Sequence, residues 1–145
     1  MTAYTPRSID DQLDFLVANV PAFAIEGAKG VGKTASAQQH AKAALYLDDP
    51  SDQLVASADP TFSTINERPL LLDEWQYIPQ VWNTVRRAVD AGAPPGSFIL
   101  TGSASPQPES DTHSGAGRIL GTVMRPMTIA ERQPQEPKIK LSDLF

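Results

Sequence analysis

The stretch Gly27-Ala-Lys-Gly-Val-Gly-Lys-Thr34 decides the fold class of this 145-residue chain. It fits the pattern G-x-x-x-x-G-K-[S/T], in which a glycine-rich turn holds phosphate with backbone N–H groups. Its three glycines can adopt backbone angles that other residues avoid, so successive N–H groups can turn inward and form an anion nest. The stretch therefore predicts a phosphate-binding loop, and the alternative is a glycine-rich turn with an exposed lysine.

The residues on either side of this loop have the composition that such a loop needs. Phe23-Ala-Ile25 is a short apolar run that we interpret as a strand, and residues 33–44 are rich in Ala and Gln, which favours a helix. The helix would add its positive N-terminal end to the phosphate site. Lys33 would reach the outer phosphates, and Thr34 would offer its hydroxyl to magnesium.

Apolar runs and helical periodicity alternate along the rest of the chain. Ser8 and Asp11 resemble a capping box at the start of a helix that Pro21 closes. We expect helices over 8–20 and 79–91, a short helix with turns over 51–66, and strands over 44–47, 69–74, 97–101 and 119–124. Strands alternating with helices predict an α/β fold, a parallel sheet with helices on both faces. Uninterrupted apolar strands fit, because parallel sheets are buried on both sides.

A second motif, Leu70-Leu-Leu-Asp-Glu74, is a buried-strand pattern that runs into two carboxylates. We expect Asp73 to hold magnesium, directly or through water, and Glu74 to polarise an attacking water. Neighbouring side chains at a strand end point in different directions, so the two acids can divide these roles. The alternative is a pair of solvated acids before a turn.

A third element, Phe98-Ile-Leu-Thr-Gly-Ser103, ends another buried strand with polar residues. A polar side chain between the two motif strands could sense the γ-phosphate or orient water. Thr101 is the first candidate and Ser103 the second, and the alternative is an ordinary strand terminator.

Composition bounds the class of protein. Hydrophobic residues make up 41% of the chain, which is enough for a core, and the net charge of −5 argues against a broad nucleic-acid-binding surface. The chain has no cysteine, so a disulfide framework and a thiolate metal site are excluded. No apolar run approaches the ~20 residues of a membrane span. The acidic N-terminal region lacks the basic start of a signal peptide, so we expect a cytoplasmic protein.

The three elements, in this order, resemble AAA-type ATPases of the additional-strand P-loop class. The motifs at 70–76, 99–104, 115–119 and 124–131 resemble one prokaryotic AAA family, whose longer members carry a C-terminal nuclease-like domain of poorly defined role. The resemblance covers nearly the whole chain. It implies a P-loop NTPase fold with a five-stranded sheet in the order 5-1-4-3-2.

The loop, the acids and the resemblance together give a predicted site for ATP and Mg²⁺. Thr34 and Asp73 are the predicted metal ligands, and the catalytic candidates are Lys33, Glu74, Thr101 and Arg118. The predicted nucleotide contacts are Gly27, Lys29, Gly30, Val31, Gly32, Lys33, Thr34 and Ala35.

The role of Arg118 rests on the resemblance alone. It precedes the last strand, where related ATPases place an arginine finger that reaches the γ-phosphate of a neighbouring subunit. This implies a homo-oligomer. Arg118 could equally be a surface arginine or pair with Asp111 or Glu109, and the rival fingers are Arg125, Arg86 and Arg87.

AAA ATPases normally follow the sheet with a small helical lid, and this chain stops before any such lid. We expect residues 1–130 to form an AAA-type nucleotide-binding core. Residues 131–145 would be a Pro-rich tail that leads to a C-terminal region missing from this chain.

Three functions are compatible with these features. The first is Mg-dependent ATP hydrolysis with water activated by Glu74, and the second is a nucleotide-dependent binding or regulatory module with little turnover. The third, a GTPase or small-molecule kinase, is disfavoured because the chain has neither an N-K-x-D guanine-reading motif nor an arginine-rich lid segment. The substrate, ring size and any protein partner are not written in the sequence, and nothing directly indicates nucleic acid or membrane.

Overall fold

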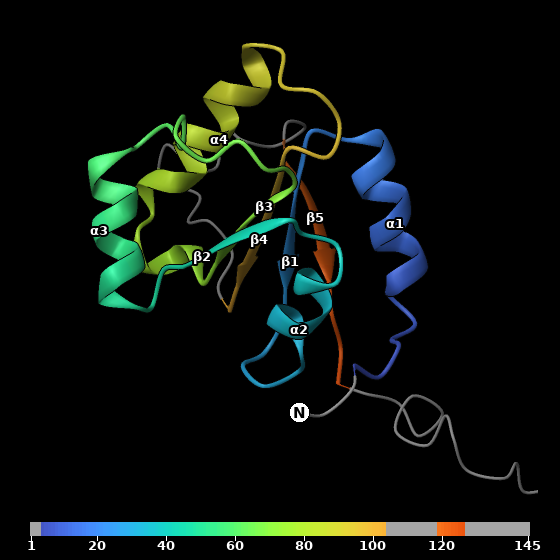
Figure 1. The fold of residues 1–145 in the computed structure, drawn as a ribbon. Helices are drawn as coiled ribbons and strands as arrows, with labels where there is room; N and C mark the ends of the chain where they lie inside the picture. Colours follow the sequence, from blue (N-terminus) through green and yellow to red (C-terminus); the bar gives the residue numbers. More distant parts are fainter. Residues whose placement is uncertain (1–3, 104–118, 127–145) are drawn as a thin grey trace, which may run out of the picture.

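A computed structural model describes residues 4–103 and 119–126 of the chain. The elements run from the N-terminal side to the C-terminal side as they are coloured in Figure 1. In order they are α1 (Asp10–Asn19), β1 (Ala22–Glu26), α2 (Lys33–Gln38), β2 (Ala43–Tyr46), α3 (Pro50–Ala58), β3 (Leu70–Asp73), the 3₁₀ helix η1 (Trp75–Tyr77), α4 (Gln80–Asp90), β4 (Phe98–Gly102) and β5 (Leu120–Val123).

The strands form one five-stranded sheet in the order β2-β3-β4-β1-β5, and every pair is parallel. This is the predicted order 5-1-4-3-2 read from the other edge, so the predicted α/β fold class and strand order are confirmed. β3 is a central strand: Leu72 lies opposite Leu45 of β2 and Leu100 of β4. Since all strands point the same way, the loops after β1, β3 and β4 emerge at one edge of the sheet.

Two hydrophobic clusters cover the two faces of this sheet. Alternate residues of each strand belong to different clusters, as a period of two requires: Leu70 and Leu72 face one way and Leu71 the other. α1 and α2 pack over the face that carries Leu71, and α3 and α4 pack over the opposite face. Figure 1 shows α1 and α3 on opposite sides of the sheet.

The helix expected over 33–44 is shorter than predicted. α2 ends at Gln38, and Ala43 already pairs with Leu70 in the sheet. The amide of Lys42 donates to the carbonyl of Pro69, so strand pairing begins where alanine-rich composition alone favours helix. Tertiary pairing therefore overrides local helix propensity in this segment.

The capping box expected at Ser8 and Asp11 is wrong. α1 begins at Asp10 with Ile9 as its N-cap residue, which makes no side-chain cap hydrogen bond. The acid that binds a backbone amide at this end is Asp10, whose Oδ2 accepts from the amide of Arg7 at 2.8 Å. This contact fixes the chain just before the helix rather than inside its first turn.

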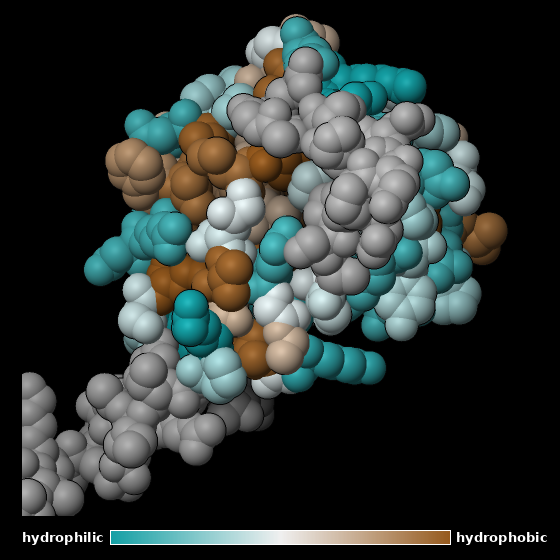
Figure 2. All heavy atoms as spheres, turned by 180° about the vertical axis from the view of Figure 1, so that it is seen from behind, coloured by the Kyte–Doolittle hydropathy of each residue, from teal (hydrophilic) through white to brown (hydrophobic). Residues whose placement is uncertain are grey.

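β5 lies at the edge of the sheet and exposes apolar side chains. The exposed large hydrophobic residues on this side are Phe15 of α1 and Leu120 and Val123 of β5. Figure 2, seen from behind, shows brown side chains gathered on the side of the molecule that carries α1 and β5. None of the helices within 4–103 and 119–126 combines the length and apolar character needed to cross a membrane.

Candidate nucleotide site

The glycine loop connects β1 to α2 at the carboxyl edge of the sheet. Gly32 has a φ of 101°, a left-handed conformation that residues with a Cβ rarely adopt. A Cβ on Gly27 would lie 2.5 Å from the carbonyl oxygen of Met124, so only glycine allows the loop to approach the end of β5. The sequence therefore forms the turn that the motif predicts. Glycine is needed at position 32 for its backbone angle and at position 27 for the close approach to Met124.

Lys33 lies over the loop with its side chain almost fully enclosed. It is 4% exposed, and its Nζ donates to the carbonyl oxygens of Gly27 at 2.8 Å and Ala28 at 3.0 Å. These contacts compensate a cation that would otherwise be costly to bury. The ammonium group is thereby held against the first two residues of the glycine loop.

Asp73 ends β3 directly beside the loop helix. Its Oδ1 accepts hydrogen bonds from the hydroxyls of Thr34 and Thr101, both at 2.6 Å. Asp73 is 4% exposed and Thr101 is fully buried, so this carboxylate is held by two donors from different elements. A carboxylate beside a hydroxyl gives the hard oxygen ligands that Mg²⁺ prefers, and Mg²⁺ in phosphate sites takes only one or two protein carboxylates. The predicted pair Thr34 and Asp73 fits such a cation.

Glu74 follows Asp73 in a strained backbone conformation. Its φ of 58° and ψ of 53° lie in the left-handed region, which is uncommon for a residue with a Cβ and often marks a functional site. Its amide donates to Oγ1 of Thr101 at 3.1 Å, and its carboxylate accepts a hydrogen bond from the amide of Gln76. The hydroxyl of Thr101 thus donates to the carboxylate of Asp73 and accepts from the backbone amide of Glu74.

A cavity of about 450 Å³ lies against the loop. Its walls are Arg7, Pro126 and loop residues 28–32, which include the predicted contacts Lys29, Gly30 and Val31. A second cavity of about 270 Å³ shares Arg7 and Pro126 with the first and extends between Ser8, Gln12 and the end of β5. Ala35, also predicted as a contact, is exposed on the first turn of α2.

Comparison with known protein families assigns the chain to a family. The family model of the AAA domain matches residues 19–133, which include the loop, both acids and Thr101. The chain belongs to the AAA domain family. Membership supports a nucleotide-binding, ATPase-like function for the site. A search of curated proteins finds no significant match to the chain.

The arginine finger predicted for this AAA domain lies outside the described residues, because Arg118 falls between 103 and 119. Among its rivals, Arg125 is exposed and lines the smaller cavity next to the loop. Arg86 and Arg87 lie on α4, which packs on the sheet face opposite α2. Of these rivals, only Arg125 lines one of these two cavities, the smaller one, which shares Arg7 and Pro126 with the cavity at the loop.

Sequence reasoning missed two residues that contact the site of this AAA domain. Gln76, which binds the carboxylate of Glu74, stands in the 70–76 motif two positions after that acid, and this spacing is the signal that could have found it. Arg7 donates to the carbonyl of the loop residue Val31 at 2.7 Å. No motif marks Arg7 in the sequence, because its acceptors are backbone atoms.

Proposed function

We propose that this chain binds Mg-ATP in the glycine loop and hydrolyses it with Glu74 as the base. The observation that carries the proposal is the meeting of Lys33, Thr34 and Asp73 at one edge of the sheet. A cation over an amide nest and a hydroxyl paired with a carboxylate are the two parts that a metal-bound triphosphate requires. The AAA domain match supports the same assignment.

The loop would bind the phosphates through backbone amides and Lys33. Residues 27, 29–32 and 35 supply main-chain contacts, and Lys33 would exchange its two loop carbonyls for phosphate oxygens. Its present contacts, at 2.8 and 3.0 Å, keep the ammonium group next to the nest before the phosphates arrive. Binding would therefore replace two hydrogen bonds to carbonyls and would not have to order a side chain that is free in solvent.

Thr34 and Asp73 would hold Mg²⁺. The bound cation would neutralise charge that develops on the transferred phosphoryl group. Thr34 can keep donating its proton to Asp73 while a lone pair of its oxygen faces the metal, because a hydroxyl is both donor and acceptor. Thr101 would keep the other hydrogen bond to Asp73 and so fix the carboxylate.

Glu74 would take a proton from the attacking water. The water oxygen would form a bond to the γ-phosphorus as the bond from this phosphorus to the bridging oxygen breaks, and ADP would leave. The protein would contribute to this step by positioning the water and by stabilising the charge that develops. Thr101, hydrogen-bonded to the Glu74 amide, would position this acid relative to Asp73. We further propose that Arg118 acts as an arginine finger on the nucleotide of a neighbouring subunit in a homo-oligomer. Residues 1–130 would form the nucleotide-binding core of each subunit, and residues 131–145 would form a Pro-rich tail.

A second candidate is a nucleotide-dependent binding module with little turnover. The observation that favours it is the hydrogen bond from Gln76 to the Glu74 carboxylate, which engages the proposed base. A base engaged in this way must be released before it can accept a proton from water. The two candidates share one nucleotide site and differ in whether that release occurs.

Calorimetric titration of Mg-ATP tests the binding function. Wild type should bind, and Lys33→Ala should lose at least about tenfold in affinity because a charged contact to phosphate is gone. Lys42→Ala removes an exposed lysine outside the loop and should bind like wild type. No binding by folded wild type would contradict the proposal, and tighter binding of Mg-GTP than Mg-ATP would redirect it to the GTPase alternative.

Steady-state turnover separates the two candidates. Glu74→Gln should bind Mg-ATP normally and lose about 10²-fold or more in rate, the usual contribution of a general base. Equal rates for wild type and Glu74→Gln would sink the water-activation role and favour the binding module.

A further inference from the structure

Arg7 is a buried arginine that bridges two distant segments of the backbone. It is 7% exposed, its Nη1 donates to the carbonyl of Val31 at 2.7 Å, and its Nη2 donates to the carbonyl of Arg125 at 2.9 Å. A guanidinium presents its donors in a rigid planar fork, so one side chain fixes the relative positions of two acceptors. Arg7 thereby ties the glycine loop to the chain that follows β5.

The contact between Arg7 and the loop is close. A Cβ placed on Gly32 would lie 2.6 Å from Nη1 of Arg7, well inside the distance that real Cβ atoms tolerate. A side chain at Gly32 would therefore push the Arg7 guanidinium out of its present place, in addition to the strain that the positive φ would cause. Arg7 and the loop form one packed unit.

The bond to the Val31 carbonyl controls the direction of the next amide. The Val31 C=O and the Gly32 N–H belong to one planar trans peptide, in which they point in opposite directions. With the oxygen held toward Arg7, the Gly32 N–H faces away from Arg7. This N–H is one of the donors of the predicted phosphate nest.

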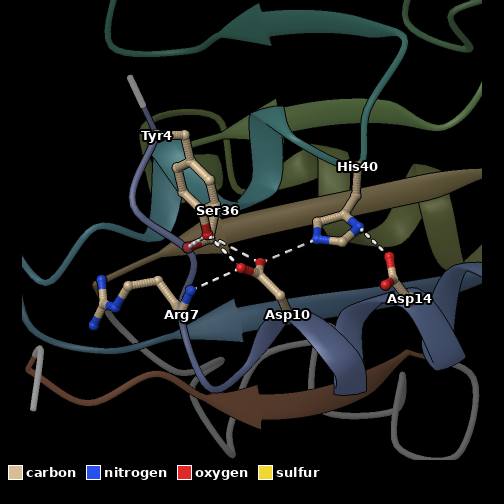
Figure 3. A network of polar contacts seen from close by, with 6 residues as sticks. All are labelled: Tyr4, Arg7, Asp10, Asp14, Ser36 and His40. Atoms are coloured by element: carbon tan, nitrogen blue, oxygen red, sulfur yellow. Dashed lines mark hydrogen bonds and ion pairs between the residues drawn. The ribbon is translucent and has the colours of Figure 1, made fainter. Parts of the chain in front are cut away.

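A network of polar contacts holds the backbone of Arg7 in place (Figure 3). Its amide donates to Asp10, which also accepts from the hydroxyl of Tyr4 and lies 3.2 Å from Nε2 of His40. The hydroxyl of Tyr4 in turn shares a hydrogen bond of 2.9 Å with Ser36 of α2. Burial raises the pKa of Tyr4, so its hydroxyl keeps the proton that it donates. Figure 3 shows the Arg7 guanidinium turned away from this network, so backbone and side chain have separate partners.

We propose that Arg7 is a positioning residue for the nucleotide: it holds the Val31–Gly32 peptide so that the Gly32 N–H faces the phosphates. The inference rests on the proposed function, because it concerns the same loop. Arg7 acts through the loop and does not itself need to touch the nucleotide. Its role therefore depends on the geometry of the guanidinium, and a substitution that keeps only the positive charge should not preserve nucleotide affinity.

Arg7→Lys tests this directly, because lysine keeps the charge but is a single point that cannot reproduce the two-carbonyl fork. We expect Mg-ATP affinity, measured by calorimetry, to fall at least about tenfold, the factor that one lost charge-assisted hydrogen bond corresponds to. Arg7→Gln, which is neutral and has a shorter side chain that reaches less far toward the Val31 carbonyl, should show the same loss. In ¹H–¹⁵N spectra without nucleotide, the Gly32 amide should shift in both variants, while the spectra as a whole remain those of a folded protein.

Lys42→Ala is the control for net charge. It removes one positive charge at an exposed position outside the loop and outside both cavities, as Arg7→Gln removes one at the loop. Lys42→Ala should bind Mg-ATP more than fivefold tighter than Arg7→Gln. Comparable weakening by Lys42→Ala would overturn the proposal, because loss of positive charge away from the loop would then explain the effect.

The remaining outcomes separate this inference from the proposed function. Absence of Mg-ATP binding by wild type would refute the proposed function, and with it the premise that the glycine loop binds phosphates. Binding by wild type with equal affinity for folded Arg7→Lys would overturn only the role of Arg7. Failure of both Arg7 variants to fold would also overturn it, since Arg7 would then serve the stability of the fold.

Discussion

The hydroxyl of Thr34 lies 2.6 Å from Oδ1 of Asp73, although 39 positions separate the two residues in the chain. Thr34 follows the glycine loop after β1, and Asp73 ends β3, two strands away across β4. Parallel pairing carries the ends of these strands to one edge, so the contact is a consequence of sheet order. The contact between the helix that follows the glycine loop and the acid that ends β3 thus follows directly from the topology.

Thr34→Ala should remove the magnesium-dependent part of ATP binding. In the presence of Mg²⁺ we expect about tenfold weaker binding, the scale on which loss of a group around a metal acts. With a chelator present, wild type and variant should bind ATP equally, because the loop amides and Lys33 are untouched. Calorimetry under both conditions measures the difference, and Thr34→Ser should behave like wild type. A loss of equal size with the chelator would assign Thr34 to the loop and not to the metal.

Thr101→Val should destabilise the fold and slow turnover. Valine has nearly the shape of threonine, but it leaves the Glu74 amide without this acceptor and Asp73 without this donor in a fully buried position. The free energy of unfolding should fall by about 1–3 kcal/mol, the cost of an unsatisfied buried polar group. Urea unfolding and steady-state turnover check both effects, with Thr101→Ser as the variant that keeps the hydroxyl. An unchanged free energy of unfolding in Thr101→Val would show that these hydrogen bonds make no net contribution to the stability of the fold.

The sequence is sufficient to predict those parts of the fold in which a local pattern of residues is compatible with one structure. The glycine spacing predicts the loop, the uninterrupted apolar runs predict buried parallel strands, and the acids after Leu72 predict a polar strand end. The strand order came from the resemblance to AAA-type ATPases and not from any pattern in the residues. With that order, the meeting of Thr34 and Asp73 could be predicted before any coordinate was known.

The rest depends on partners that sequence patterns do not mark. Arg7 binds carbonyl groups, and every residue has one, so nothing in the sequence indicates its acceptors. The end of α2 at Gln38 is set by pairing of Ala43 with β3, a long-range interaction that helix propensity ignores. The left-handed backbone of Glu74 likewise goes with a long-range contact, the hydrogen bond from its amide to Thr101, 27 positions away.

Asp59→Asn should weaken the fold in a way that depends on pH. Hydrogen bonds from Thr64, and then from Ser63, lower the pKa of Asp59 from 3.8 to about 2. Because the folded-state pKa is the lower one, the ionised carboxylate stabilises the fold above about pH 4, and this contribution is lost as pH falls toward 2. The gap in urea midpoint between wild type and Asp59→Asn should therefore shrink from pH 6 to pH 3. Asp48→Asn, an exposed acid after β2, controls for net charge, and a gap that does not change with pH would refute this explanation.

Gln76→Ala should raise turnover without changing the KM for ATP. In the structure the amide of Gln76 donates to the Glu74 carboxylate, so the base must leave this partner before it accepts a proton from water. Removing the partner should raise kcat by up to about tenfold, the rate equivalent of one such hydrogen bond. Gln80→Ala, an exposed glutamine at the start of α4, should turn over like wild type.

The double variant Glu74→Gln with Gln76→Ala shows whether the gain acts through the base. If Gln76 acts by restraining Glu74, adding Gln76→Ala to Glu74→Gln should change nothing, because no base is left to release. A gain that persists without the Glu74 carboxylate would place the effect elsewhere, such as in product release. A slower Gln76→Ala enzyme would reverse the assignment, since the hydrogen bond would then hold Glu74 in its working position.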